Sequence, residues 1–133
     1  MQIKELSYDG VALNWVHVTE HWGVGIKNYK PANDIANLDN LERHNGTDEL
    51  FVLLEGECTL LSGTEIDGGL ELSKLPMVPG KVYAIPAGLW HNTVTRPGVK
   101  LVLIEDQASA QSNSEILTLT AEQIEAARAL LGG

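Results

Sequence analysis

Frequent turn-forming residues divide this chain into short segments, and this pattern limits its fold more than any other feature of the sequence. Thirteen glycines and five prolines are spread along 133 residues. Turn signals occur at 23–25, 45–46, 56, 62–63, 67–69, 79–80 and 97–98, most of them about 7 to 17 residues apart. Such spacing is typical of an all-β sandwich or barrel, and the length suits one domain with its own hydrophobic core.

Between the turns lie segments rich in β-branched and aromatic residues, which strands favour. They predict strands at 11–18, 24–29, 50–54, 58–61, 81–85, 92–95 and 99–104. The runs 50–54 and 101–104 are apolar on both faces of a strand. One face can fill the core, whereas the other needs a second sheet or a partner subunit as cover. We therefore expect a homodimer.

The ends of the chain differ from this pattern. The segment 31–40 is expected to be a loop, and the small polar residues of 107–119 predict a linker after a barrel core at about 10–106. Thr120 and Gln123 have the spacing of a capping box. Ile124, Ala127 and Leu130 follow at helical intervals, so the sequence predicts a short amphipathic helix at 120–131 that completes a single domain over 1–133.

Charge and cysteine content exclude several classes of function. Nine Lys and Arg residues stand against eighteen Asp and Glu, giving a formal charge of −9, which disfavours nucleic acid and anionic membranes as partners. The single cysteine, Cys58, cannot form an internal disulfide. No apolar run approaches the roughly 20 residues that span a bilayer, and the first residues lack a signal-peptide pattern. We expect a cytoplasmic protein.

One cluster of potential metal ligands precedes the apolar run 50–54. Glu42 and His44 are two residues apart, so on a strand their side chains share a face. An Asn–Gly turn follows, and Glu49 begins the next predicted strand. Carboxylate and imidazole groups suit a divalent metal better than they suit nucleophilic catalysis.

A second neighbourhood lies forty residues further along. Pro86 and Gly88 form a rigid turn that can present His91 at the start of another strand. A single histidine near a turn is most often a structural residue, so neither neighbourhood identifies a site on its own. No glycine-rich phosphate loop and no serine-centred nucleophile elbow is present, and Cys58 has no adjacent basic residue to activate it.

Together the two neighbourhoods resemble the paired motifs of the cupin superfamily, in particular the small single-domain cupin-2 type. His44 is followed by four residues, Glu49, six residues and Gly56, as in the first motif. Gly80, Pro86, Gly88 and His91 match the second motif at every spacing. Three positions depart from the pattern: Glu42 replaces the first histidine of His-x-His, Thr95 replaces the final asparagine, and Ala36 stands where the first motif begins with glycine.

This resemblance implies a fold and a metal site. The fold is a double-stranded β-helix, or jelly-roll barrel, of about eight strands with a short C-terminal helix. The implied cofactor is one divalent ion (Fe, Mn, Ni, Co or Zn) held by Glu42, His44, Glu49 and His91. If Glu42 turns away, the other three form the two-histidine, one-carboxylate set of non-haem iron oxygenases.

The residues around this site are expected to form a small-molecule cavity. By strand alternation, Phe51 and Leu53 share a face with Glu49 and should line the barrel below the metal. Trp90, next to His91, is a candidate for the rim. The resemblance suggests an isomerase or dioxygenase that acts on a small oxygen-bearing metabolite. The alternative is a cupin that binds a small molecule or has a structural role, without turnover.

Overall fold

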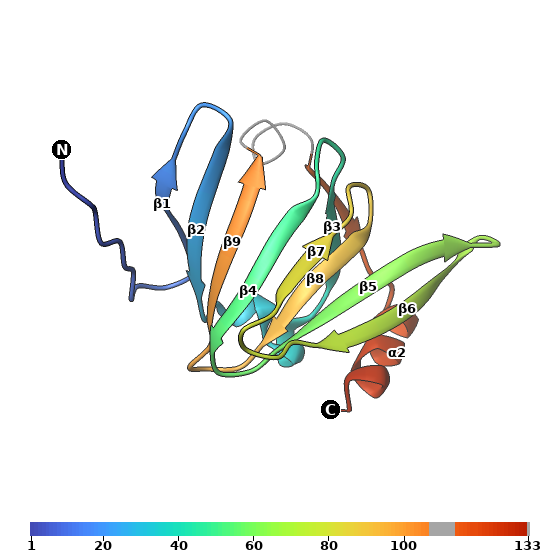
Figure 1. Ribbon diagram of the computed structural model, residues 1–133. Coiled ribbons are helices and arrows are strands. Elements are labelled where there is room, and N and C mark those ends of the chain that lie inside the picture. The colour runs from blue at the N-terminus through green and yellow to red at the C-terminus, as the bar shows by residue number, and fades with distance from the viewer. Residues whose placement is uncertain (107–113, 133) are drawn as a thin grey trace.

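The computed structural model describes residues 1–106 and 114–132. In these ranges ten strands form two five-stranded antiparallel sheets, followed by one C-terminal helix (Figure 1). The strands are β1 (Leu13–Val18), β2 (Trp22–Asn28), β3 (Asn40–His44), β4 (Glu49–Glu55), β5 (Cys58–Ile66), β6 (Gly69–Pro76), β7 (Val82–Ile85), β8 (Trp90–Thr95), β9 (Lys100–Asp106) and β10 (Ser114–Thr118). The helix is α2 (Ala121–Leu131). The prediction of an all-β jelly-roll barrel with a C-terminal helix is confirmed.

The two sheets exchange strands along the chain, so residues distant in sequence become neighbours. The first sheet has the order β1-β2-β9-β4-β7, and the second has the order β10-β3-β8-β5-β6. The chain changes sheet repeatedly, and two of these crossings lie between β3 and β4 and between β7 and β8. These two crossings contain the turns of the two sequence motifs. The motif residues therefore face the space between the sheets from both sides.

The core has two parts, one on each face of the second sheet. The first part lies between the sheets and includes Phe51, Leu53, Leu101 and Leu103. The second part lies on the outer face of the second sheet, where α2 covers it. It comprises Leu38, Leu41, Leu61, Trp90, Leu119 and Ala127. The helix thus provides the second cover that this sheet needs.

Outer residues of the first sheet have no such cover from the described parts of the chain. On β4, Leu54 is 48% exposed, and on the neighbouring edge strand β7, Val82 is 65% exposed. In Figure 1, α2 lies beside the β5–β6 hairpin and away from β1, β2 and β9. The homodimer expected from such two-sided strands stays a prediction.

Most predicted strands are present with shifted ends, but the prediction of a linker over 107–119 is wrong for its last part. Residues 107–113 lie outside the described residues, whereas Ser114–Thr118 form β10, which pairs with β3. β6 was also not predicted, and the expected loop 31–40 contains two short 3-10 turns. The capping box of α2 is confirmed: the Thr120 side chain accepts a hydrogen bond from the Gln123 backbone N–H, and the Gln123 side chain accepts one from Thr120. Within the described ranges, no helix has the length and apolar character needed to cross a membrane.

Candidate metal centre

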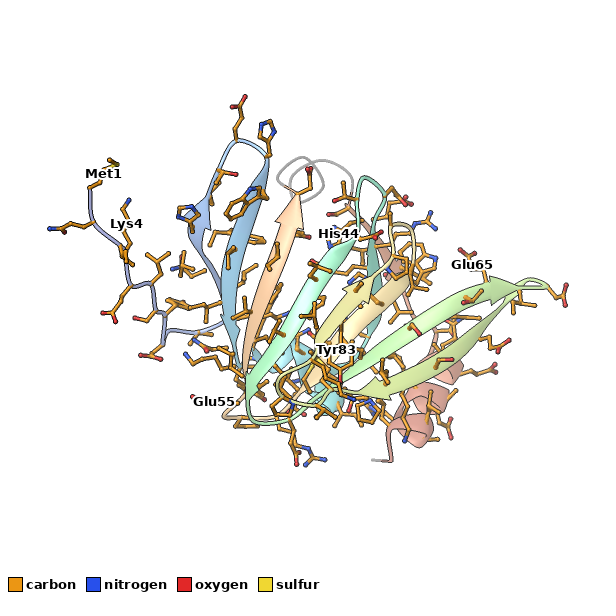
Figure 2. All side chains as sticks on the ribbon, in the orientation of Figure 1. Met1, Lys4, His44, Glu55, Glu65 and Tyr83 are labelled. Atoms are coloured by element: carbon orange, nitrogen blue, oxygen red, sulfur yellow. The ribbon has the colours of Figure 1, made fainter. Side chains whose placement is uncertain are left out.

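A cavity of about 240 Å³ lies between the two sheets at one end of the barrel. Figure 2 shows His44 towards this end and Glu55 at the opposite end of the same sheet pair. The polar wall of the cavity consists of Lys27, Glu42, His44, Glu49, His91, Thr93, Glu105 and Ser114. Its apolar wall consists of Leu13, Trp15, Phe51 and Leu103.

Strand geometry brings the predicted metal ligands to this cavity. Glu42 and His44 lie on the inner face of β3, while the alternate residues Leu41 and Arg43 lie on the outer face, against Trp90. Glu42 pairs directly with His91 of β8, so these two side chains also share a face. Glu49 begins β4 in the opposite sheet.

Hydrogen bonds join the two motif turns to each other. The backbone N–H of Gly88 donates to the His44 carbonyl over 2.8 Å, and the N–H of Ala87 donates to Asp48 Oδ1 over 2.9 Å. Gly88 adopts a φ of 83°, in the left-handed region that glycine accepts without a Cβ clash. The Pro-x-Gly turn therefore holds the end of β3, and with it His44, next to the start of β8.

His91 is fixed so that its Nε2 atom faces the cavity. Its Nδ1–H donates to the Leu89 carbonyl over 2.9 Å, and its Nε2 lies 3.0 Å from Glu49 Oε1. The imidazole is buried, with 2% of the residue exposed. A ring held in this way through Nδ1 leaves Nε2 for a metal, as is usual for ligating histidines.

His44, at the end of β3, is oriented in the same way: Nδ1 has a hydrogen-bond partner and Nε2 faces the cavity. Its Nδ1 lies 2.7 Å from Ser114 Oγ, while its Nε2 lies 3.2 Å from Glu105 Oε1 and 3.6 Å from Glu49 Oε2. Two groups of three residues have ligand atoms that all lie within 4.8 Å of one another inside the group. One group is Glu42, His44 and His91, and the other is His44, Glu49 and Glu105. His44 belongs to both groups, and all four predicted ligands line one cavity together with a fifth donor, Glu105.

The fifth donor, Glu105, was not identified from the sequence. It lies on β9 and is only 5% exposed. The buried positions of this strand alternate as Leu101, Leu103 and Glu105. A glutamate in phase with the inward leucines was the available signal, and it was missed because the predicted strand ended at residue 104.

The two buried carboxyl groups, Glu49 and Glu105, have pKa values shifted in opposite directions. Glu49 and Glu105 are joined by a side-chain hydrogen bond, which requires one of them to be protonated. Burial, followed by this hydrogen bond and the negative charge of Glu49, raises the pKa of Glu105 to about 9. Burial also acts to raise the pKa of Glu49, but the hydrogen bonds from His91 and Glu105 outweigh it and lower that pKa. Glu49 is thus the anionic member and Glu105 the protonated one.

The charges of carboxyl groups in the cavity also shift the pKa of His91. Burial alone lowers the pKa of His91, but its hydrogen bonds to Glu49 and the Leu89 carbonyl, with the charges of Glu49 and Glu42, outweigh burial and raise this pKa. The carboxylates therefore favour the protonated forms of His91 and Glu105 near the centre of the cavity. A cation fits among the same side chains in place of protons.

Of the three residues predicted to line the cavity, the structure places one in its wall and two elsewhere. Phe51 lines the cavity and meets the His91 ring edge-on, with 6.4 Å between ring centroids. Leu53 is buried in the core between the sheets but is not part of the cavity wall. The prediction that Trp90 lies at the rim is wrong: neighbouring residues of a strand face opposite ways, so Trp90 packs in the outer core and donates to Glu65 Oε1 over 2.9 Å.

The described residues contain a second hollow at the other end of the barrel, of about 280 Å³, near Cys58 and Arg96. No group of potential metal ligands found among the described residues lies there. Burial raises the pKa of the Cys58 thiol to about 12, so this cysteine is an inert core residue rather than a nucleophile. Among the described residues, the groups that could hold a metal therefore line the first cavity.

Comparison with known proteins gives structural likeness only. No protein-family model matches the chain, and no curated protein matches it. A cupin-2 domain protein from Shewanella frigidimarina superposes with a TM-score of 0.52 at 18% identity, over 75% of this chain and 85% of that one. Oxalate oxidase in complex with the substrate analogue glycolate superposes with a TM-score of 0.51 at 18% identity, over 74% of this chain.

The match covers 46% of oxalate oxidase, so the present chain spans about half of that protein. A Streptomyces protein solved with uridine superposes with a TM-score of 0.60 at 9% identity, over 92% of this chain and 96% of that one. At these identities the likeness establishes the fold, and the ligands belong to the proteins in which they were seen.

Proposed function

We propose that this chain, which has the cupin fold, binds one divalent metal ion between its two sheets through Glu42, His44, Glu49 and His91. One observation carries the proposal: His44 and His91 approach from two strands with both Nε2 atoms turned inward and both Nδ1 atoms held by hydrogen bonds. Ligating histidines are oriented in this way by the partner of their other nitrogen.

The donor set fits a borderline metal. Two imidazole nitrogens and two carboxylates suit Fe, Mn, Ni, Co or Zn, and the absence of sulfur among the donors disfavours Cu(I). Glu42 lies within 4.8 Å of donor atoms of both histidines, which supports a four-residue set over the alternative in which Glu42 turns away. Glu105 is available as an additional oxygen donor or as a hydrogen-bond partner of Glu49.

The cavity supports a role in binding or converting a small oxygen-bearing metabolite. A bound divalent metal supplies Lewis-acid polarisation of a ligand oxygen. The chain itself supplies an apolar wall at Phe51 and Leu103, the carboxyl group of Glu105, and the side chain of Lys27. A carboxyl group beside the metal donors is a candidate general acid or base, and it favours an enzyme, isomerase-like or dioxygenase-like, over a protein that only binds.

The alternative is a cupin that binds a small molecule without converting it. The structural neighbours were solved with ligands as different as glycolate and uridine, so the fold does not select a substrate. Turnover of a candidate metabolite by the metal-loaded protein separates the two readings. For both candidate functions we propose a cytoplasmic protein, which is compatible with the free, buried Cys58. We also propose that its partner is a second copy of the chain.

Elemental analysis tests the metal. Protein purified without added metal and then dialysed against each candidate ion should hold about one equivalent of at least one of them. His91→Ala should lose most of this metal, whereas His17→Ala, which removes an exposed histidine outside the cavity, should retain it. Wild-type protein that takes up none of the ions contradicts the proposal.

A further inference from the structure

The inner face of β2 carries one charged residue, Lys27. Strand pairing places Lys27 opposite Leu101 of β9, and Leu101 and Leu103 are inward residues of that strand. The other inward positions of β2 are Gly23 and Gly25, which have no side chains to fill the space. The Lys27 side chain therefore enters the same cavity as Glu42, Glu49 and the two histidines.

This ammonium group is only partly satisfied. Lys27 Nζ donates one hydrogen bond, over 3.2 Å, to Thr93 Oγ1, a neutral hydroxyl on β8. Among the described residues it forms no ion pair within 4.0 Å, although Glu42 and Glu49 act on it through their charge from further away. An ammonium has three donors, so two of them remain for a ligand in the cavity.

A bound metal ion would add positive charge to the cavity that already contains Lys27, and this favours an anionic ligand there. Burial lowers the pKa of Lys27, and in the absence of metal the negative charges of Glu42 and Glu49 act in the opposite direction and favour the ammonium form. Once those carboxylates hold a cation, the same cavity contains a metal ion and an ammonium group, and burying a charge is costly unless it is paired. A ligand with a negative oxygen group restores the balance.

We infer that Lys27 is the anion-binding group of this cavity, and that the ligand is a small molecule with a carboxylate or a similar anionic oxygen group. This inference rests on the proposed metal function, since the ligand would lie between the metal donors and Lys27. Thr93 positions the ammonium group, and Leu13 and Trp15 of β1 cover the apolar part of the ligand. The volume of about 240 Å³ limits the ligand to a small metabolite.

Two probes of equal size test the inference. Pyruvate and pyruvamide have the same number of heavy atoms, but only pyruvate carries a negative charge. Each is titrated by calorimetry into Co²⁺-loaded protein, after uptake of Co²⁺ has been measured on the same sample. A hydrogen-bonded charge pair should make the wild type prefer pyruvate by about 10- to 100-fold.

Lys27→Met keeps the apolar stem and removes the charge, so its preference for pyruvate should fall at least about 10-fold below that of the wild type, to the preference that the bound Co²⁺ alone provides. Lys30→Met makes the same change at an exposed lysine outside the cavity and should keep the wild-type preference. Lys27→Gln is a second neutral variant in case the methionine perturbs folding, and Co²⁺ uptake shows that each variant retains its site.

The outcomes are distinct. Equal binding of both probes by the wild type, which needs no variant, overturns the inference, as does a preference for pyruvate that is undiminished in both Lys27 variants. Wild-type protein that takes up no Co²⁺ fails at the earlier step, and it removes both the proposed function and the site on which this inference rests.

Discussion

Glu42 lies directly opposite His91 in the antiparallel pairing of β3 with β8. The cupin motif that this region resembles has a histidine at the position of Glu42. Because backbone register determines where a strand residue points, a glutamate at this position still reaches the donor cluster with His44 and His91. The departure from the motif exchanges one metal-binding group for another and adds a negative charge.

Changing Glu42 tests its part in the site directly. Glu42→Gln removes the charge and a strong oxygen donor, so metal affinity should fall by at least 10- to 100-fold, since loss of even a supporting partner costs about that much. Glu42→His restores the motif and should retain tight binding. Calorimetric titration with Co²⁺ and Zn²⁺ measures both, and an affinity of Glu42→Gln within about twofold of the wild type would show that Glu42 is not a ligand.

Glu105 should make the metal-free protein less stable as pH rises. Its pKa is raised from 4.5 to about 9 in the folded state, so between these values the unfolded chain binds fewer protons than the folded one. The free energy of unfolding therefore decreases as pH rises through this window, and the contribution of Glu105 is complete only below its unfolded pKa.

Glu105→Gln keeps a hydrogen-bond donor for Glu49 without a titrating proton. Urea unfolding of the metal-free variant should depend less on pH and should give a free energy of unfolding higher than the wild type by at least about 1 kcal/mol near pH 9. Glu71→Gln, at an exposed position of β6, should follow the wild type. If Glu105→Gln and the wild type lose stability in parallel, Glu105 does not hold the proton.

Gly88 should be important for stability because of its backbone conformation. Alanine at a φ of 83° costs about 1–2 kcal/mol, and any shift also strains the hydrogen bond from Gly88 to the His44 carbonyl. Gly69→Ala is the matched control, since its φ is not in the left-handed region and its new Cβ meets the Ile66 carbonyl at an ordinary 3.5 Å. Equal unfolding midpoints for the two variants would contradict this account of the turn.

The outer face of β4 and β7 should mediate dimerisation. Light scattering coupled to size-exclusion chromatography should give the mass of two chains, and Val82→Glu combined with Leu54→Glu should give the mass of one, because charges disfavour an apolar interface. Ile66→Glu changes an exposed apolar residue on β5 and serves as the control. A wild-type monomer at micromolar concentration would remove the reason for expecting a partner.

Local sequence signals were sufficient for part of this structure. The spacing of Gly56, Gly80, Pro86 and Gly88 predicted the turns, and alternation within one strand correctly grouped Glu49 with Phe51 and Leu53. Such features depend on neighbours in the chain, so they can be identified before the fold is known.

The remaining features depend on pairing between distant strands. Lys27 and Glu105 reach the cavity only because β2 pairs with β9 in one particular register. β10 has no distinctive composition, and its strand conformation comes from pairing with β3. Trp90 was misplaced although the alternation rule, applied to its neighbour His91, puts the two side chains on opposite faces.

The proposed function requires one metal ion bound among Glu42, His44, Glu49 and His91. Anomalous diffraction at the absorption edge of the bound metal, from crystals of the metal-loaded protein, tests it most directly. We predict a single strong peak about 2.0–2.2 Å from the Nε2 atoms of His44 and His91, with carboxylate oxygens of Glu42 and Glu49 at similar distances. Metal-loaded crystals without a peak in this cavity, or with a peak only on surface residues, would contradict it.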